Sequence, residues 1–214
     1  MNEIKDSEHI FIAGMTGCGK TKLAEVYTAG MGTVIKLDTK QEYDSKRMEN
    51  EEPWEGLKEG EDYEVCFSLE QVFASESEKI IYQIPWDEQN EDCYNKLFEW
   101  GYQNGHIRFW VDELMTVCPN SMNCPKWLKA IYTAGRSRYV TIIGCSQRPT
   151  GIPPVCISNS THHFCFALPL MSDRKKMTDL TGCLAFMEKP GKYWFWYYKE
   201  GMEEESVKQY KLKL

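Results

Sequence analysis

The chain has 214 residues, and its 32 Asp and Glu against 25 Lys and Arg give a formal net charge of −7. This length predicts a single α/β domain over residues 1–214, with a sizeable core. No apolar run approaches the roughly 20 residues of a membrane-spanning helix, and the first residues lack the apolar centre of a signal peptide. Nine cysteines without a C-x-x-C pair indicate neither a disulfide framework nor a zinc ribbon.

Cysteine and histidine residues offer one weak candidate for a metal site. Cys118 and Cys124 could be grouped with His162, His163 and Cys165, but these spacings match no zinc pattern. Free thiols in a reducing cytoplasm are therefore the interpretation that we favour.

The first predicted strand, Ile10–Ala13, leads into a glycine-rich loop and then into a predicted helix at 20–27. The loop reads G-x-x-x-x-G-K-T and fits the Walker A motif, or phosphate-binding loop. Glycines let consecutive backbone N–H groups curl around a phosphate chain, and the helix directs its partial positive charge at the same anion. The predicted nucleotide-binding residues are Gly14, Met15, Thr16, Gly17, Cys18, Gly19, Lys20 and Thr21.

Individual side chains of the loop have distinct expected roles. Lys20 is expected to contact the β- and γ-phosphates of ATP as a catalytic cation, and the Thr21 hydroxyl to ligate Mg²⁺. Cys18 is expected to be exposed in the empty loop, where a helix N-terminus favours the thiolate. A chance match on a glycine-rich turn is disfavoured, because an apolar strand precedes the motif and a helix-compatible segment follows it.

A second predicted strand at 33–37 is followed by an acidic segment, residues 42–64. This segment carries ten acidic side chains against three basic ones and few apolar residues beyond Trp54 and Leu57. It is predicted to be a solvated, mobile insertion. The rest of the chain is balanced in charge, which leaves room for a local basic surface.

Strands and helices are predicted to alternate along the remaining chain. Such alternation favours a mostly parallel central sheet with helices on both faces. The aromatic-rich tail favours a C-terminal antiparallel hairpin at the sheet edge. The expected strands lie at 79–84, 107–111, 139–145, 163–168 and 193–198, and the expected helices near 69–75 and at 91–103, 126–133 and 173–180.

The apolar strand 107–111 ends in Asp112 and Glu113, which fits a Walker B motif. Asp112 is expected to hold Mg²⁺, directly or through water. Glu113 is placed to polarise the attacking water as a general base. An Asp-Glu pair alone is commonly just a strand-to-loop transition, but its position downstream of a Walker A motif favours the catalytic interpretation.

Further candidates flank the strand 139–145. Gln147, just past its end, could hold the lytic water and sense the γ-phosphate, or it could simply cap the turn before Pro149. Arg136 and Arg138, before the strand, are arginine-finger candidates that would meet a neighbouring subunit's nucleotide. A plain solvated turn is the alternative for these two arginines.

Taken together, these motifs resemble the FtsK–HerA superfamily of P-loop DNA-translocating ATPases. The resemblance implies a RecA-like (ASCE-type) P-loop NTPase fold, with Gln147 as a sensor. It also implies that Arg136 acts in trans within a ring, expected to be a hexamer. The matching segments run in family order over about residues 9–174 and comprise 14–21, 38–43, 111–113, 135–136, 146–149, 163–168 and 173–174.

The chain departs from larger members of that superfamily in having neither an N-terminal barrel nor a winged-helix tail. It looks instead like the genome-packaging ATPases of viruses with double jelly-roll capsids. The resemblance thus implies an ATPase that drives double-stranded DNA into a capsid. It would act in the host cytoplasm or at the packaging vertex of the virion, with capsid vertex proteins as partners.

DNA in such a motor would be gripped through its phosphates, without sequence preference. Two other functions remain compatible with the sequence, namely a P-loop ATPase that remodels protein partners in phage assembly or secretion, and a small-molecule kinase. The kinase is disfavoured because the Asp112–Glu113 pair provides water activation and no Arg-rich lid is present. The candidate DNA contacts are a pool in which each member could be an ordinary surface charge: Arg148, Arg174, Lys175 and Lys176, with Lys126 and Lys129.

Overall fold

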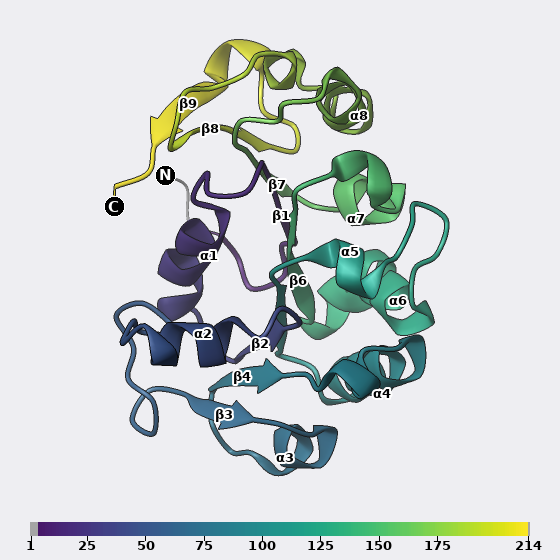
Figure 1. Cartoon of the computed structure of the whole chain (residues 1–214). Helices are drawn as coiled ribbons and strands as arrows, with labels where there is room; N and C mark the ends of the chain where they lie inside the picture. Colours follow the sequence, from purple (N-terminus) through teal and green to yellow (C-terminus); the bar gives the residue numbers. More distant parts are fainter. Residues whose placement is uncertain (1–3, 214) are drawn as a thin grey trace.

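The computed structural model describes residues 4–213, which form one sheet with helices packed on both faces (Figure 1). The strands are β1 (Ile10–Ala13), β2 (Val34–Asp38), β3 (Glu64–Cys66), β4 (Lys79–Gln83), β5 (Arg108–Val111), β6 (Thr141–Ser146), β7 (His162–Cys165), β8 (Trp194–Lys199) and β9 (Lys208–Lys211). Their spatial order is β3-β4-β2-β5-β6-β1-β7-β8-β9.

The sheet is parallel from β3 to β7 and antiparallel over its last two pairings. β1 lies between β6 and β7, with Phe11 opposite Gly144 on one side and His163 on the other. β8 and β9 form the C-terminal antiparallel hairpin at one edge. Both the mostly parallel sheet and the edge hairpin agree with the sequence-based prediction.

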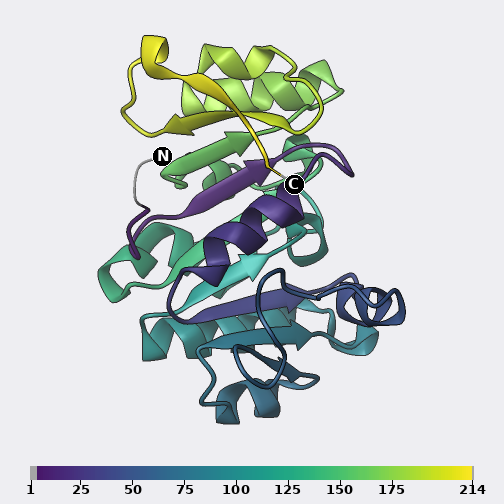
Figure 2. The ribbon, with the colours of Figure 1, turned by 90° about the vertical axis from the view of Figure 1, so that its left-hand side faces the viewer.

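Helices cover the two faces of the sheet unequally. In Figure 1, α1 and α2 lie on one side of the strands, whereas α4, α5, α6 and α7 lie on the other. Seen face-on, α1 lies across the middle of the sheet, and the hairpin and β3 with α3 mark its two ends (Figure 2). The helices are α1 (Lys20–Ala29), α2 (Glu42–Met48), α3 (Leu69–Ala74), α4 (Glu91–Asn104), α5 (Leu114–Val117), α6 (Lys126–Ala134), α7 (Pro154–Ser158) and α8 (Met171–Thr181).

Alternate side chains of each central strand enter two separate cores. Ile10 and Ile12 pack beneath α1, whereas Phe11 and Ala13 belong to the core on the opposite face. This double burial explains why the central strands are almost continuously apolar. Among residues 4–213, none of the helices combines the length and the apolarity needed to cross a bilayer.

The acidic segment 42–64 differs from the solvated, mobile insertion that its composition predicts. Trp54 is fully buried, stacks edge-on against Trp110 of β5 at 5.6 Å between ring centroids, and donates its indole N–H to Thr28. Tyr43 and Tyr63 are also buried. Three aromatic side chains pack the segment against the domain, and most of its charged side chains stay in solvent.

Candidate nucleotide-binding and catalytic site

The glycine-rich loop follows the end of β1, and its first residues are hydrogen-bonded to the end of β6 and to the segment after β7. The backbone N–H of Gly14 donates to Ser146 at 3.1 Å, and that of Met15 donates to Ala167 at 3.0 Å. Gly17 and Gly19 have φ values of 72° and 105°, a region that side chains disfavour. α1 then begins at Lys20, so the loop leads directly into the first turn of the helix, whose backbone N–H groups have no partner within the helix.

Lys20 is buried within the loop. Its ammonium group donates to the carbonyl oxygen of Met15 at 3.1 Å, across the space that the loop surrounds. A carbonyl is a weak partner for a buried cation, so an incoming phosphate would be a better one.

Cys18 differs from the exposed thiolate that its position predicts. Its side chain is 6% exposed, and burial raises the pKa of the thiol even though Lys20 lowers it in part. The effect of desolvation therefore exceeds that of the helix N-terminus. The thiol is a packed, neutral side chain beneath the loop.

Asp112 lies at the end of β5 and faces the first turn of α1. One of its carboxylate oxygens, Oδ1, accepts a hydrogen bond from the Thr21 hydroxyl at 3.0 Å, although β6 separates β5 from β1. Burial alone would raise the pKa of Asp112, but the charge and hydrogen bond of Lys40, with smaller effects of Lys36 and Thr21, hold it below the usual range. The site thus contains an ionised carboxylate beside a hydroxyl, which are oxygen donors of the kind that Mg²⁺ prefers.

Lys40 is a site residue to which sequence reasoning assigned no role. Its ammonium nitrogen lies 2.6 Å from Oδ2 of Asp112 and 3.8 Å from Glu42. Although burial opposes protonation, attraction to Asp112 raises the pKa of Lys40. The available signal was its position just after β2, which pairs with β5 and ends at the same edge of the sheet.

Glu113 follows Asp112 and caps the start of α5. Its carboxylate accepts from the backbone N–H of Met115 at 3.5 Å, and the side chain is 7% exposed. Burial raises the pKa of Glu113, and Lys40 and Lys20 offset this only in part. A buried carboxylate with a raised pKa is a stronger proton acceptor than an exposed one.

Gln147 reaches the glycine-rich loop from the end of β6. Its side-chain oxygen accepts from the Thr16 hydroxyl at 2.6 Å. The next turn, residues 149–151, receives no side-chain cap hydrogen bond, so the geometry favours a place at the loop over the alternative of a capping residue. Gln147 therefore lies at the same sheet edge as Lys20, Thr21, Asp112 and Glu113.

Arg136 and Arg138 precede β6 and lie at the amino-terminal ends of the parallel strands. The glycine-rich loop lies at the carboxyl ends of these strands. Arg138 donates to the carbonyl of Gln103 at 2.8 Å and lies over the Tyr102 ring, so it is engaged within the chain. Arg136 is exposed, and its guanidinium makes no hydrogen bond or ion pair with any residue between 4 and 213. Neither arginine can reach the loop of its own chain, because the length of the strands lies between.

Two of the candidate DNA contacts make interactions within the chain. Arg148 forms an ion pair with the fully buried Asp173 at 2.9 Å, and Lys176 donates to the carbonyls of Thr150 and Ile152. Both therefore fasten α8 to the segment after β6, although half of the Arg148 side chain remains exposed. Lys126, Lys129 and Lys175 are exposed, whereas Arg174 is half-buried against Met171.

The metal grouping considered from the sequence does not form. His162 is hydrogen-bonded to Glu8 and Tyr197, and His163 contacts the carbonyl of Ile157. Both rings thus make their hydrogen bonds at the sheet and not with Cys118 or Cys124.

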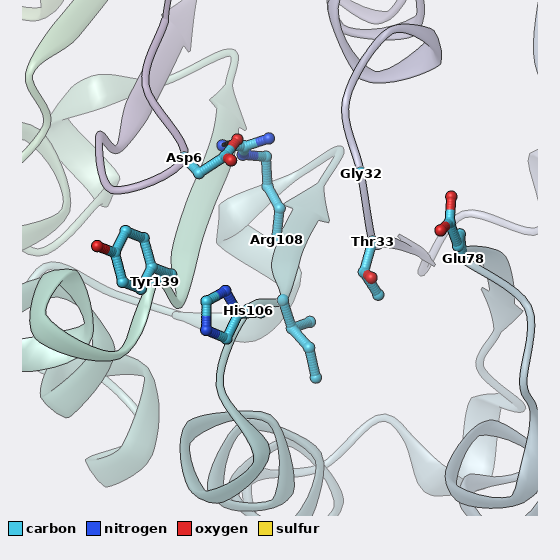
Figure 3. A pocket seen from close by; sticks show the side chains of 8 residues that line it. Asp6, Gly32, Thr33, Glu78, His106, Arg108 and Tyr139 are labelled. Atoms are coloured by element: carbon cyan, nitrogen blue, oxygen red, sulfur yellow. Dashed lines mark hydrogen bonds and ion pairs between the residues drawn. The ribbon is translucent and has the colours of Figure 1, made fainter.

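A separate cavity of about 210 Å³ lies at the amino-terminal edge of the strands (Figure 3). Within this cavity, a guanidinium nitrogen of Arg108 lies 3.2 Å from a carboxylate oxygen of Asp6. The His106 ring stacks on the Tyr139 ring with 4.8 Å between the ring centroids. Its position on the edge away from the glycine-rich loop separates it from the nucleotide site.

The chain matches no protein-family model and none of the curated proteins. Among solved structures it is similar to the genome-packaging NTPase B204 of Sulfolobus turreted icosahedral virus 2 in complex with AMPPCP. That match has a TM-score of 0.73 and 14% identity, and it covers 97% of this chain and 99% of B204. VirB4 of Thermoanaerobacter pseudethanolicus matches with a TM-score of 0.62 and 13% identity over 100% of this chain and 92% of VirB4.

A third similar structure is the pCW3 conjugation coupling protein TcpA with ATPγS. Its TM-score is 0.60 at 15% identity, over 96% of this chain and 60% of TcpA. At these identities the likeness establishes the fold. This chain has the fold of these P-loop ATPases, and the resemblance expected from its motifs is confirmed at that level.

Proposed function

We propose that this protein is an ATP-hydrolysing DNA translocase that packages a double-stranded DNA genome into a viral capsid. The observation that carries this proposal is the convergence of Lys20, Thr21, Asp112, Glu113 and Gln147 at one sheet edge. The near end-to-end likeness to a genome-packaging NTPase supports the choice of substrate. Together they favour an ATP-driven motor.

Each of these residues would have a distinct role in ATP hydrolysis. The loop N–H groups and Lys20 would bind the phosphates of ATP, and Thr21 with Asp112 would hold Mg²⁺. When bound, Mg²⁺ supplies positive charge that offsets the charge developing on the phosphate oxygens. Glu113 would accept a proton from the attacking water, and Gln147 would orient that water.

Assembly into a ring would complete this site. Arg136 is exposed and unengaged at the edge opposite the loop, which suits a finger that acts on the neighbouring subunit's nucleotide. We therefore propose a ring, with a hexamer as the expected size, around double-stranded DNA. It would work in the host cytoplasm and at the packaging vertex of the virion, where capsid vertex proteins would be its partners.

The deciding experiment measures ATP hydrolysis by the assembled protein with and without duplex DNA. We expect stimulation by any sequence, falling steeply as salt rises, because phosphate contacts release counterions. The triple variant Lys126→Ala, Lys129→Ala, Lys175→Ala should flatten that salt dependence and spare basal turnover. A matched control, Lys189→Ala, removes an exposed lysine outside the pool.

One outcome would overturn the proposal. An assembled, ATP-hydrolysing protein whose rate ignores DNA at low salt would favour the remodelling of protein partners in phage assembly or secretion. Transfer of phosphate to a small molecule rather than to water would favour the kinase.

A further inference from the structure

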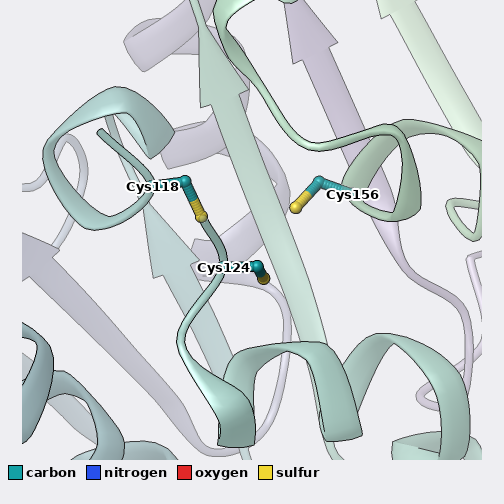
Figure 4. A group of neighbouring side chains, drawn as sticks. All are labelled: Cys118, Cys124 and Cys156. Atoms are coloured by element: carbon teal, nitrogen blue, oxygen red, sulfur yellow. The ribbon is translucent and has the colours of Figure 1, made fainter. Parts of the chain in front are cut away.

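Three cysteines from separate segments bring their sulfur atoms together outside the catalytic set (Figure 4). Cys118 follows α5, Cys124 lies just before α6, and Cys156 belongs to α7. Their three Sγ atoms all lie within 4.8 Å of one another, and all three residues are free thiols. Cys118 and Cys156 are fully buried, whereas Cys124 is half-buried.

The mutual spacing of the three sulfurs fits one metal ion better than it fits a disulfide. Zinc–thiolate bonds of about 2.3 Å in a tetrahedral site place neighbouring sulfurs about 3.8 Å apart. The three thiols could reach that spacing with shifts of about 1 Å or less, whereas a disulfide needs sulfurs about 2 Å apart and would leave the third thiol without a partner. A single metal ion, unlike a disulfide, would use all three sulfur atoms.

The surroundings provide access for an ion and compensation for charge. Cys124 lines a cavity of about 180 Å³ that also contacts Glu91 and Asn123, which gives an ion an entry path and leaves room for a water ligand. Three thiolates around a divalent cation would leave one negative charge. Lys129 and Lys176 lie within electrostatic reach of Cys124 and Cys156, and the N-terminus of α6 adds partial positive charge beside Cys124.

A buried hydroxyl nearby lacks a partner. The Tyr132 hydroxyl has no hydrogen-bond partner among the described residues, and it lies within electrostatic reach of all three sulfurs. A metal-bound water in the fourth position could satisfy such a group. The orphaned hydroxyl is an observation independent of the thiol spacing.

We propose that Cys118, Cys124 and Cys156 bind one thiophilic divalent cation, Zn²⁺, with a water molecule in the fourth position. The ion fastens the segment that follows Glu113 to the segment that follows Gln147, since Cys118 ends the first and Cys156 belongs to the second. It acts as a structural clamp behind the nucleotide site, and its binding contributes directly to folding stability.

Cobalt substitution tests the ligand set in the intact chain. Reduced full-length protein, stripped with a chelator, should bind one equivalent of Co²⁺ and show the visible bands of tetrahedral cobalt and the near-ultraviolet thiolate charge-transfer band. Zn²⁺ should displace the cobalt and raise the midpoint temperature of unfolding. Absence of these bands in folded protein would overturn the proposal, as would a disulfide between any two of the three thiols.

Single substitutions identify the ligands. Cys118→Ser, Cys124→Ser and Cys156→Ser should each lose about a third of the charge-transfer intensity, because one of three sulfur ligands is removed. Cys66→Ser, at a buried cysteine far from the group in the chain, should keep the full spectrum. If Cys118→Ser or Cys156→Ser fails to fold, the half-buried Cys124→Ser decides alone, and an unchanged spectrum in that variant would contradict the proposal.

Discussion

Lys40 donates a hydrogen bond to Asp112 with only 2.6 Å between its ammonium nitrogen and Oδ2, while Thr21 donates to the other oxygen at 3.0 Å. The carboxylate proposed to hold Mg²⁺ therefore already has a cation against it. The two cations compete for one buried charge, so Lys40 must yield or share Asp112 when Mg·ATP enters. This competition can be measured.

Lys40→Met should lower the Mg²⁺ concentration that gives half-maximal ATP turnover. A hydrogen bond to a charged group is worth about 1.5–3 kcal/mol, so the expected change is on the order of tenfold. In a chelator the same variant should unfold at a lower temperature, because Asp112 loses its partner while it stays buried. Lys40→Arg keeps the charge and serves as the control. An unchanged Mg²⁺ requirement in Lys40→Met would show that the two cations do not compete.

Glu113→Gln should bind ATP with near-normal affinity while hydrolysis falls by about a hundredfold or more, the usual contribution of a general base. The amide keeps the shape of the side chain but accepts no proton. Equilibrium binding of a labelled nucleotide and single-turnover hydrolysis separate the two effects. Joint loss of binding and turnover would instead make Glu113 a structural residue or a metal ligand.

The pH dependence of turnover provides a second test of the same side chain. Because burial raises the pKa of Glu113, the base form is lost at a higher pH than for an exposed glutamate. Turnover should therefore rise with pH along a limb whose midpoint lies above 4.5, in a nucleotide-saturated, folded sample. A midpoint at or below 4.5 would contradict the assignment.

Arg136→Ala should leave ATP affinity intact and reduce turnover of the assembled protein by about a thousandfold or more, as expected for an arginine finger. Lys20→Ala should abolish turnover in every subunit that carries it. Mixed rings should recover part of the activity, because a Lys20→Ala subunit can still supply Arg136 to a neighbour that binds ATP. Mixed assembly without recovery would argue against action in trans, and Arg138→Ala is the matched comparison.

Acid stability should depend on Glu8, at the edge of the sheet away from the loop. Burial alone would raise the pKa of Glu8, but hydrogen bonds from His162, the Lys5 backbone and Lys199 lower it from 4.5 to about 2. The ionised form stabilises the fold above pH 4.5, and this contribution is lost as the pH falls from 4.5 toward 2.

Glu8→Gln should therefore cost about 1.5–3 kcal/mol at pH 7, the range for hydrogen bonds to charged groups, and the difference from wild type should shrink below pH 4.5. Urea unfolding at both pH values measures it. Glu200→Gln changes an exposed carboxyl and should behave like wild type. A difference that is independent of pH would mean that Glu8 acts through packing rather than through charge.

Much of the fold and the site could be predicted from local patterns. The predicted bounds of the strand Ile10–Ala13 agree with those in the structure, because the apolar run ends clearly where the glycine-rich loop begins. Asp112 and Gln147 follow strand ends, and the carboxyl ends of parallel strands meet at one edge. Their convergence therefore needed only the order of the elements.

Contacts between segments that are distant in the sequence could not be predicted from local sequence patterns. Trp54 is a lone aromatic in an acidic stretch, and its burial depends on Trp110 lying beneath it. Lys40 meets Asp112 only because β2 lies beside β5, and Cys156 joins Cys118 only through the packing of α7. The spacing of hydrophobic residues indicates which face of a helix or strand is buried, but it does not indicate which other element packs against that face.

The position of β1 between β6 and β7 affects how the protein is made. When the ribosome has finished the phosphate-binding loop, neither neighbour of its strand exists yet, since β6 begins at Thr141 and β7 ends at Cys165. A nascent chain therefore carries β1 unpaired through most of translation, and ATP has no finished loop to bind until β7 emerges. Such long-range pairing slows folding and leaves apolar strands open to aggregation until the late strands are made.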